Sequence, residues 1–132
     1  MTTQLLIYES VVPISNGRHA KFSMEVASNY AFSRGVNSVP LMAVEFPPAA
    51  PEYAIVFAGK GDEVMPVAVL GVRKNENMYL TPAGTWQAKY VPAFLRRYPF
   101  VFSASEDGKT FTLCVDEAFP GLLLLRLEGR MF

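Results

Sequence analysis

Charge of either sign is scarce in this chain of 132 residues, and the charges that are present cancel. Charged residues make up 18% of the chain, and 12 Lys and Arg balance 12 Asp and Glu. An average soluble domain carries about 25% charged residues. Because no net field attracts a polyanion or an anionic membrane surface, nucleic acid is not an expected ligand.

Cysteine, histidine and long apolar runs are scarce as well. The one cysteine, Cys114, cannot form an internal disulfide, and its apolar alternation predicts a buried, inert strand residue. One His and one Cys among scattered carboxylates give no paired ligand spacing, so neither a metal nor another cofactor is predicted. No charged, apolar leader precedes Tyr8, and no apolar run approaches the roughly 20 residues that cross a bilayer. We therefore expect a soluble, cytoplasmic protein without a membrane span.

Apolar residues are abundant by contrast, at 51% of the chain. A chain of this length makes about one domain, and we expect residues 1–132 to form a single domain. The apolar alternation, interrupted by turn residues, favours an α+β fold of mostly antiparallel β-sheet, with at least six strands and two short helices. The expected strands cover residues 4–12, 18–22, 39–46, 53–58, 64–72, 77–80, 86–90, 100–105 and 109–115. Turn residues at 15–17, 59–62, 81–84 and 106–108 separate neighbouring strands, so we expect a hairpin at the N-terminus, antiparallel pairing of 53–58 with 64–72, and a hairpin at 100–115.

Two helices complete this expectation. Between residues 24 and 33 apolar side chains recur at helical spacing, with Ser23 placed to cap the start and Gly35 the end. Pro92 suits the first turn of a second short helix, which ends before Pro99. The proline-rich segment 47–51 lacks backbone donors, so a rigid connection is expected there.

The segment 84–100 concentrates the side chains of greatest functional interest. It holds the only tryptophan, Trp86, together with Tyr90, Arg96 and Arg97. A guanidinium beside aromatic rings binds a carboxylate or phosphate through parallel hydrogen bonds and stacks on the rings. These four residues and the lone His19 are therefore candidate ligand-binding residues.

A purely structural interpretation of the same residues is favoured. Aromatic clusters more often fill cores than bind ligands, and one arginine then anchors a carboxylate such as Glu45 or Asp116. Asp116 and Glu117 are expected to end a strand in solvent or to pair with an arginine. Because no motif gives His19 an orienting partner or a nucleophile, no catalytic residue is predicted.

One tryptophan and two proline-containing aromatic motifs follow one another in this segment. Trp86 precedes a Tyr-x-Pro-x-Phe motif at 90–94 and an Arg-Arg-Tyr-Pro-Phe block at 96–100. This pattern resembles the SapC-like family, and the resemblance runs from about residue 6 to 121, the N-terminal part of longer members. The family is named after an S-layer-associated secretion component, so the resemblance implies an accessory role in secretion or the cell envelope.

The run after Gly121 is the second unusual feature, because residues 122–132 diverge from the family pattern. Its apolar residues are Leu122, Leu123, Leu124, Leu125 and Leu127. A strand of such residues needs cover on both faces. Two interpretations stay open: a buried strand or helix of the same subunit, and a contact between the subunits of a homodimer.

Two functional hypotheses from different classes follow. The first is a non-enzymatic binding or assembly protein that holds a protein or peptide, as the resemblance implies. The alternative is a small-molecule-binding domain or small enzyme, whose pocket is bounded by His19, Trp86, Tyr90 and Arg96 and takes an anionic ligand. We favour the first, because no catalytic constellation is recognisable.

Overall fold

The computed structural model describes residues 7–25 and 29–124. Contacts within the chain divide it into two compact units. The first unit comprises Met1–Ala27 and Tyr98–Phe132, and the second comprises Ser28–Arg97. The single domain expected from the sequence stays a prediction.

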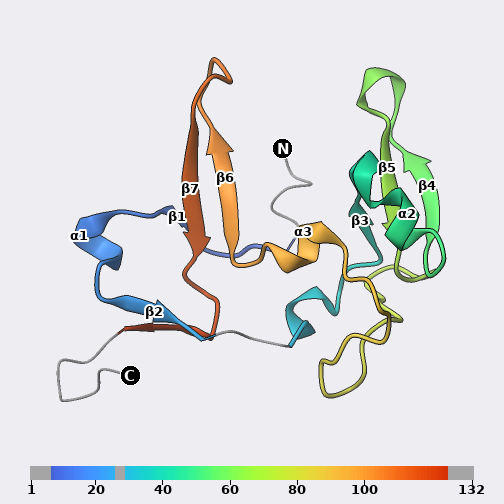
Figure 1. Ribbon diagram of the computed structural model, residues 1–132, viewed down its shortest axis with the longest axis horizontal. Helices are drawn as coiled ribbons and strands as arrows, with labels where there is room; N and C mark the ends of the chain where they lie inside the picture. The colour runs from blue at the N-terminus through green and yellow to red at the C-terminus, as the bar shows by residue number, and fades with distance from the viewer. Residues whose placement is uncertain (1–6, 26–28, 125–132) are drawn as a thin grey trace. The chain divides into compact units, whose positions relative to one another are not determined.

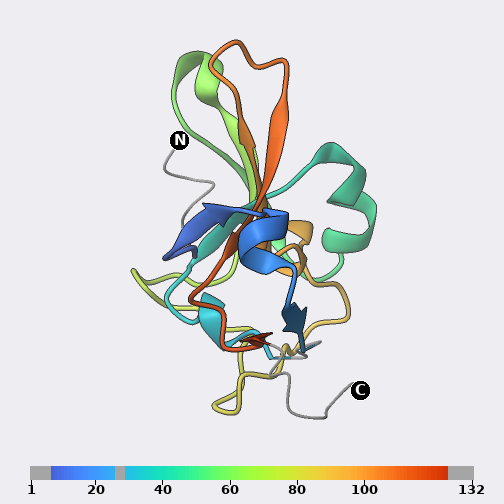
Figure 2. The same cartoon turned by 90° about the vertical axis from the view of Figure 1, so that its left-hand side faces the viewer.

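The first unit is built on an antiparallel sheet in the order β1–β7–β6 (Figure 1). Its strands are β1 (Val11–Pro13), β6 (Phe100–Ala104) and β7 (Phe111–Asp116). β6 and β7 form the hairpin expected at residues 100–115. Because β1 pairs only with Cys114, Val115 and Asp116, the rest of the hairpin extends beyond it (Figure 2).

Three further elements complete the first unit. The helical turn α1 (Asn16–His19) follows β1. β2 (Phe22–Met24) then pairs antiparallel with β8 (Leu122–Leu124), close to the other end of the sequence.

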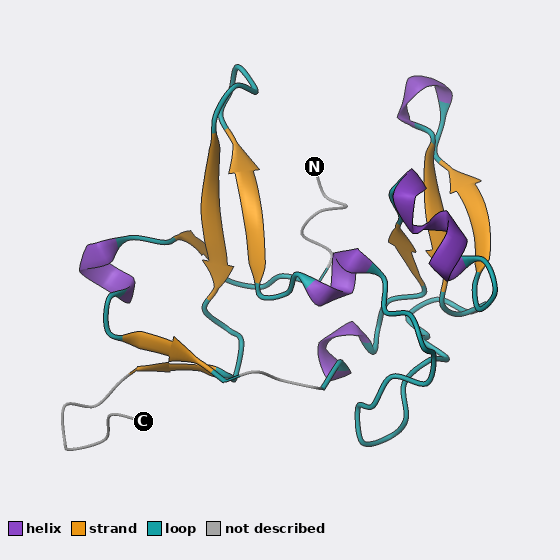
Figure 3. Cartoon of the chain, viewed as in Figure 1, coloured by secondary structure: helices purple, strands orange, loops and turns teal. Residues whose placement is uncertain are grey.

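The second unit contains a three-stranded antiparallel sheet in the order β3–β5–β4. Its strands are β3 (Ser38–Pro40), β4 (Ala54–Ala58) and β5 (Met65–Val69). The antiparallel pairing expected between 53–58 and 64–72 is therefore confirmed. The described residues of the second unit also contain five short helices (Figure 3): η2 (Ala31–Ser33), η3 (Ala43–Glu45), α2 (Phe46–Ala49), η4 (Gly61–Glu63) and α3 (Ala93–Arg96).

These pairings confirm the α+β class, since every described strand pair is antiparallel and the helices are short. The helix expected after Pro92 is confirmed as α3, with Pro92 as its N-cap. Within the described ranges, no helix has the length and hydrophobicity that crossing a membrane requires.

The helix expected at 24–33 is wrong. Met24 ends β2, Glu25 N donates to Gly121 O at 2.8 Å, and helical structure is limited to the 3₁₀ turn η2. Residues 26–28 of that range lie outside the described residues. Pairing with a strand almost a hundred residues later overrides the local helical spacing.

The N-terminal hairpin is also wrong. Residues 7–10 form no strand, and α1 replaces the turn expected at residues 15–17. The Ser15 hydroxyl caps α1 by accepting a hydrogen bond from Arg18 N at 3.3 Å. The strand expected at 18–22 consequently starts only at Phe22.

The strand expected at 39–46 stops at Pro40, because the chain turns into η3 and α2. Pro47 and Pro48 lie in the first turn of α2, where backbone donors are not needed for the helix. The segment expected as a rigid connection therefore begins as a short helix.

The strands expected at 77–80 and 86–90 are reduced to one bridge between Leu80 and Trp86. The turn expected between them is confirmed, since Gly84 N donates to Thr81 O at 2.9 Å.

Each unit has its own buried residues. Val39, Ala49 and Ala68 of the second unit are fully buried. In the first unit Val115 is 1% exposed and Cys114 is 3% exposed, so the predicted burial of Cys114 is confirmed.

The connection between β4 and β5 depends on a glycine. Gly59 has a φ of +116°, and a Cβ there would lie 2.5 Å from Glu63 O. Gly61 also has a positive φ, +57°, but a Cβ there would meet nothing within 4 Å. We predict that Gly59→Ala lowers the free energy of unfolding by about 3 kcal/mol, from backbone strain and a clash. Gly61→Ala, the matched control, should cost about 1 kcal/mol. Urea denaturation measures both, and equal losses would contradict the prediction.

Candidate functional site

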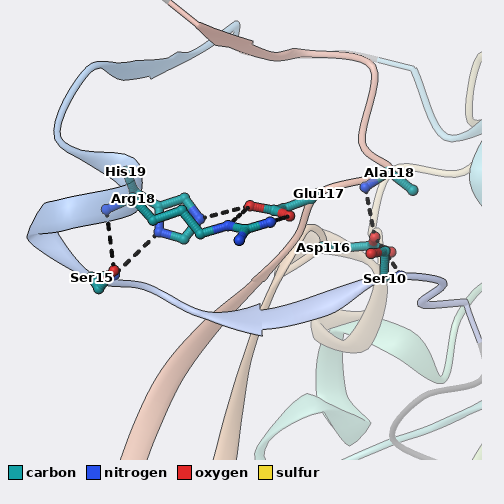
Figure 4. A network of polar contacts seen from close by, with 7 residues as sticks. All are labelled: Ser10, Ser15, Arg18, His19, Asp116, Glu117 and Ala118. Carbon is teal, nitrogen blue, oxygen red and sulfur yellow. Dashed lines mark hydrogen bonds and ion pairs between the residues drawn. The ribbon is translucent and has the colours of Figure 1, made fainter.

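A buried carboxylate lies at the end of β7 in the first unit. Asp116 is 0% exposed and accepts backbone hydrogen bonds from Ser10 N at 3.0 Å and Ala118 N at 2.9 Å (Figure 4). It also accepts a hydrogen bond from Glu9 N at 2.8 Å. The Tyr98 hydroxyl donates to it at 3.2 Å. Burial and this neighbouring carboxylate raise the pKa of Tyr98. Asp116 therefore joins the segment before β1 to the segment after β7. Its expected place in solvent is wrong, because the side chain is buried, and its pairing with an arginine stays a prediction.

The next residue, Glu117, makes the arginine pair that the sequence left open. Arg18 donates two hydrogen bonds to Glu117, from Nε to Oε2 at 2.7 Å and from Nη2 to Oε1 at 2.5 Å. His19 Nε2 lies 3.0 Å from Oε2. The hydrogen bond from Arg18, supported by that from His19 and by the charge of Arg18, lowers the pKa of Glu117 to about 2. The pair ties α1 to the end of β7.

His19 is held at both ring nitrogens. Ser15 N donates to Nδ1 at 3.1 Å, so Nδ1 is an acceptor and Nε2 carries the proton donated to Glu117. The side chain is 7% exposed, and its ring lies 5.3 Å from that of Phe22 between centroids. A general base needs an acceptor nitrogen that faces a substrate. This arrangement makes His19 part of the cap of α1.

The second unit holds Trp86 within a cluster of tyrosines. The indole is 9% exposed and stacks on Tyr79 at 5.8 Å between ring centroids, with an interplanar angle of 15°. Tyr30 meets it edge-on, also at 5.8 Å. Trp86 Nε1 donates to Tyr53 Oη at 2.7 Å, and the Tyr53 hydroxyl in turn donates to Tyr90 O. Burial raises the pKa of Tyr53 to about 12, which keeps this hydroxyl neutral. These contacts support the structural interpretation of Trp86.

Tyr90 lies beside a second buried carboxylate, Glu45, which is 5% exposed. Glu45 Oε1 accepts from Tyr90 Oη at 2.5 Å and from Ala93 N at 2.8 Å, and Oε2 accepts from Met42 N at 2.8 Å. Burial alone would raise the pKa of Glu45, but these hydrogen bonds outweigh it and lower the pKa. The carboxylate is therefore kept charged, and it joins η3 to the start of α3.

Arg96 and Arg97 have different surroundings. Exposed Arg96 donates through Nε to Val91 O at 2.9 Å and through Nη2 to Tyr90 Oη at 3.3 Å. It therefore reaches Glu45 through the Tyr90 hydroxyl, an indirect form of the predicted anchor. The Arg97 guanidinium lies 4.5 Å from the centroid of the Phe94 ring, as a cation–π contact.

The candidate ligand-binding residues fall into both units. Trp86 and Tyr90 are linked through Tyr53, and Arg96 contacts Tyr90, all in the second unit. His19 belongs to the first unit. A common ligand pocket for these residues stays a prediction.

The leucine-rich run is described only in part. Leu122, Leu123 and Leu124 form β8 and pair with β2, which matches the interpretation of a strand of the same subunit. Leu123 is 47% exposed. Leu125 and Leu127 lie outside the described residues, and the homodimer contact stays a prediction.

The sequence interpretation missed an exposed aromatic surface on the outer part of the β6–β7 hairpin. Phe102 and Phe111 are 59% and 65% exposed, and their rings meet edge-on at 6.3 Å between centroids. Leu113, 40% exposed, lies opposite Phe102 in the register. Because side chains alternate between the two faces of a strand, all three lie on one face of the hairpin. The sequence around them did not indicate whether that face is exposed or buried. We call residues 102–113 the β6–β7 arm.

Comparisons with known proteins give one family. A model of the SapC family matches residues 14–129. No curated protein and no solved structure matches the chain. In the part of the chain that is described, no three His, Cys, Asp or Glu side chains are grouped as a metal ion would require.

The Trp86 contacts lead to a stability prediction. Trp86→Ala should lower the free energy of unfolding by about 3–5 kcal/mol, because it empties the centre of the tyrosine cluster. Trp86→Phe keeps a ring but loses the donor to Tyr53, so it should cost about 1–2 kcal/mol. Chemical denaturation checks both variants. An unchanged free energy of unfolding in Trp86→Ala would contradict a structural role.

The Glu117 pair predicts a pH dependence of stability. The pKa of Glu117 is lowered from a usual value of 4.5 to about 2, so its stabilising effect is present above pH 4.5. The stabilising effect is lost as the pH falls toward 2, because Glu117 then becomes protonated in the folded protein as well as in the unfolded chain. The melting temperatures of wild type and Glu117→Gln should differ at pH 6 and converge between pH 4.5 and 2. In an Arg18→Gln background the difference should be smaller at pH 6, and a constant difference across this range would contradict the assignment.

Proposed function

This chain belongs to the SapC family, and from that premise we propose that it is a non-enzymatic binding or assembly protein that recognises another polypeptide. In this proposal it acts in the cytoplasm as an accessory to secretion or to a cell-envelope process.

The observation that carries the proposal is the β6–β7 arm. Phe102, Phe111 and Leu113 share one face, and each is at least 40% exposed. Aromatic side chains supply most of the binding energy at protein interfaces, where burial of one ring removes a large apolar area from water. A two-stranded hairpin also restrains these rings, so little conformational entropy is lost on binding. The arm therefore suits an apolar protein surface or an apolar peptide.

The polar residues support the same proposal. Asp116, Glu117 and Glu45 accept hydrogen bonds that join segments of their own unit, and both ring nitrogens of His19 are engaged. Groups used in this way are structural connections, whereas acid–base chemistry needs a titratable group directed at a substrate. The arrangement favours recognition over reaction.

A second candidate is an anionic small molecule at Arg96. Its guanidinium is exposed and supported by Val91 O and Tyr90 Oη. The charged Glu45 next to Tyr90 opposes an anion there, and Trp86 donates its only side-chain N–H group to Tyr53. This candidate therefore has less support than a polypeptide partner.

Site-specific photo-crosslinking tests the arm. A photoreactive phenylalanine analogue at position 111 should give a discrete adduct with another polypeptide in the cells that make the protein. The matched position is 72, where Val72 is 83% exposed but lies outside the arm. The identified partner should then bind the purified protein, and Phe102→Ser with Phe111→Ser should weaken that binding at least about tenfold. Identical adducts from both positions, or undiminished binding by the double variant, would refute the proposal.

A further inference from the structure

Among the residues that the structure describes, no strand pairs with the outer edge of β4 in the second unit, and we call this its open edge. Hydrogen bonds from Leu41 N to Pro66 O and from Leu70 N to Asn37 O show that the even-numbered residues of β5 face β3. In an antiparallel ladder the alternate residues face the other neighbour, so Met65, Val67 and Val69 bond to β4.

The same alternation determines which backbone groups of β4 face β5 and which face away from the sheet. Three residues of β4 lie opposite Met65, Val67 and Val69, and their backbone groups therefore point at β5: Ala54, Val56 and Ala58. Ile55 and Phe57 therefore direct their N–H and C=O groups away from the sheet. Since β4 is the last strand in the order β3–β5–β4, these groups form the open edge.

Nothing in the sequence of β4 protects this edge. Its residues Ala54–Ala58 include no charge and no proline, the usual devices against edge pairing. The other edge of the same sheet is partly protected, because one of the two outward positions of β3 is occupied by Pro40, which has no N–H. In the first unit, the edge strand β6 is partly covered, since the Tyr8 hydroxyl donates to Phe100 O at 2.7 Å.

We propose that a second copy of this chain pairs with β4 in antiparallel orientation, so that β4 strands from two copies meet about a two-fold axis at Val56. In this register Ile55 of each copy lies opposite Phe57 of the other. The backbone N–H and C=O groups of both residues point away from β5. Each of these groups therefore forms a hydrogen bond with the residue opposite it in the other copy. The two sheets then join into one continuous antiparallel sheet.

The side chains suit the same register. Val56, 44% exposed, meets its own equivalent on one face, and Phe57, 67% exposed, meets Ile55 on the other. Cross-strand pairs of β-branched and aromatic residues stabilise sheets. At each end of the paired strands, Glu52 of one copy lies opposite Lys60 of the other, so the flanking charges are complementary. A second copy therefore fits better than a strand of unspecified sequence.

This interface differs from both surfaces considered above. It uses neither the β6–β7 arm nor the leucines of β8, and so the polypeptide partner of the arm and the dimer are tested by separate experiments.

The first test is the mass of the purified full chain in solution, measured by light scattering over a concentration series. The wild type should be a dimer at about 100 μM, and Phe57→Pro should raise its dissociation constant about tenfold or more. This substitution removes an outward N–H from each copy but no hydrogen bond to β5. Phe57→Ala keeps the donor, so it should weaken the dimer less. Phe102→Pro, at the corresponding outward position on β6, is the matched control and should leave the dimer intact.

The second test does not depend on how the fold tolerates proline. Val56→Cys should form an intermolecular disulfide on mild oxidation, because opposed residues of a non-hydrogen-bonded antiparallel pair lie at a suitable separation. Val72→Cys is the exposed control and should crosslink at least about tenfold more slowly, and the native Cys114 is buried.

Three results would overturn the inference. They are a monomeric wild type at about 100 μM, equal crosslinking rates for Val56→Cys and Val72→Cys, and a dimer that resists Phe57→Pro but is lost in Leu123→Ser. The last would place the interface at the leucines of β8.

Discussion

A buried carboxylate that gathers backbone amides holds each unit of this protein together. In the first unit, Asp116 accepts from Glu9 N, Ser10 N and Ala118 N. In the second, Glu45 accepts from Met42 N and Ala93 N. Each carboxylate also accepts from a tyrosine hydroxyl, Tyr98 in one unit and Tyr90 in the other. A buried charge is tolerated only when such donors surround it, so the segments that carry the donors must stay in place.

The short elements explain why these side chains are needed. The strands are three to six residues long and the helices three or four, so few ladder or helix hydrogen bonds connect one segment to the next. Isolated elements of this length are not stable in water. Bonds from a carboxylate to distant amides replace the missing ladders. Asp116, Glu117 and Glu45 are all engaged in hydrogen bonds within their own units.

The sequence predicted the features that depend on neighbouring residues. Turn chemistry between apolar strands located the β4–β5 and β6–β7 hairpins, and Pro92 located α3. The failures involve distant partners. The segment 24–33 has local helical spacing, but Met24 pairs with Leu122, and no local signal indicates that partner. The burial of Asp116 had no signal in the alternation of β7, because Thr112 on the same face is exposed and Val115 on the opposite face is buried.

The sequence indicated which residues of the candidate site lie together, but not the role of each residue. Trp86, Tyr90 and Arg96 do lie in one connected set, as their proximity in sequence suggested. Their roles depend on Tyr53 and Glu45, which lie about 40 positions earlier in the sequence. Only the folded chain brings these two residues beside Trp86 and Tyr90. Units of this size bury a smaller share of their apolar surface than larger domains do, because surface grows relative to volume as a chain shortens. The apolar residues that no core can accommodate then remain on hairpins and sheet edges, at Phe57, Phe102 and Phe111. Association with other chains would cover such residues without requiring any change in the fold, and this physical constraint connects the composition of the chain with the binding role that we propose.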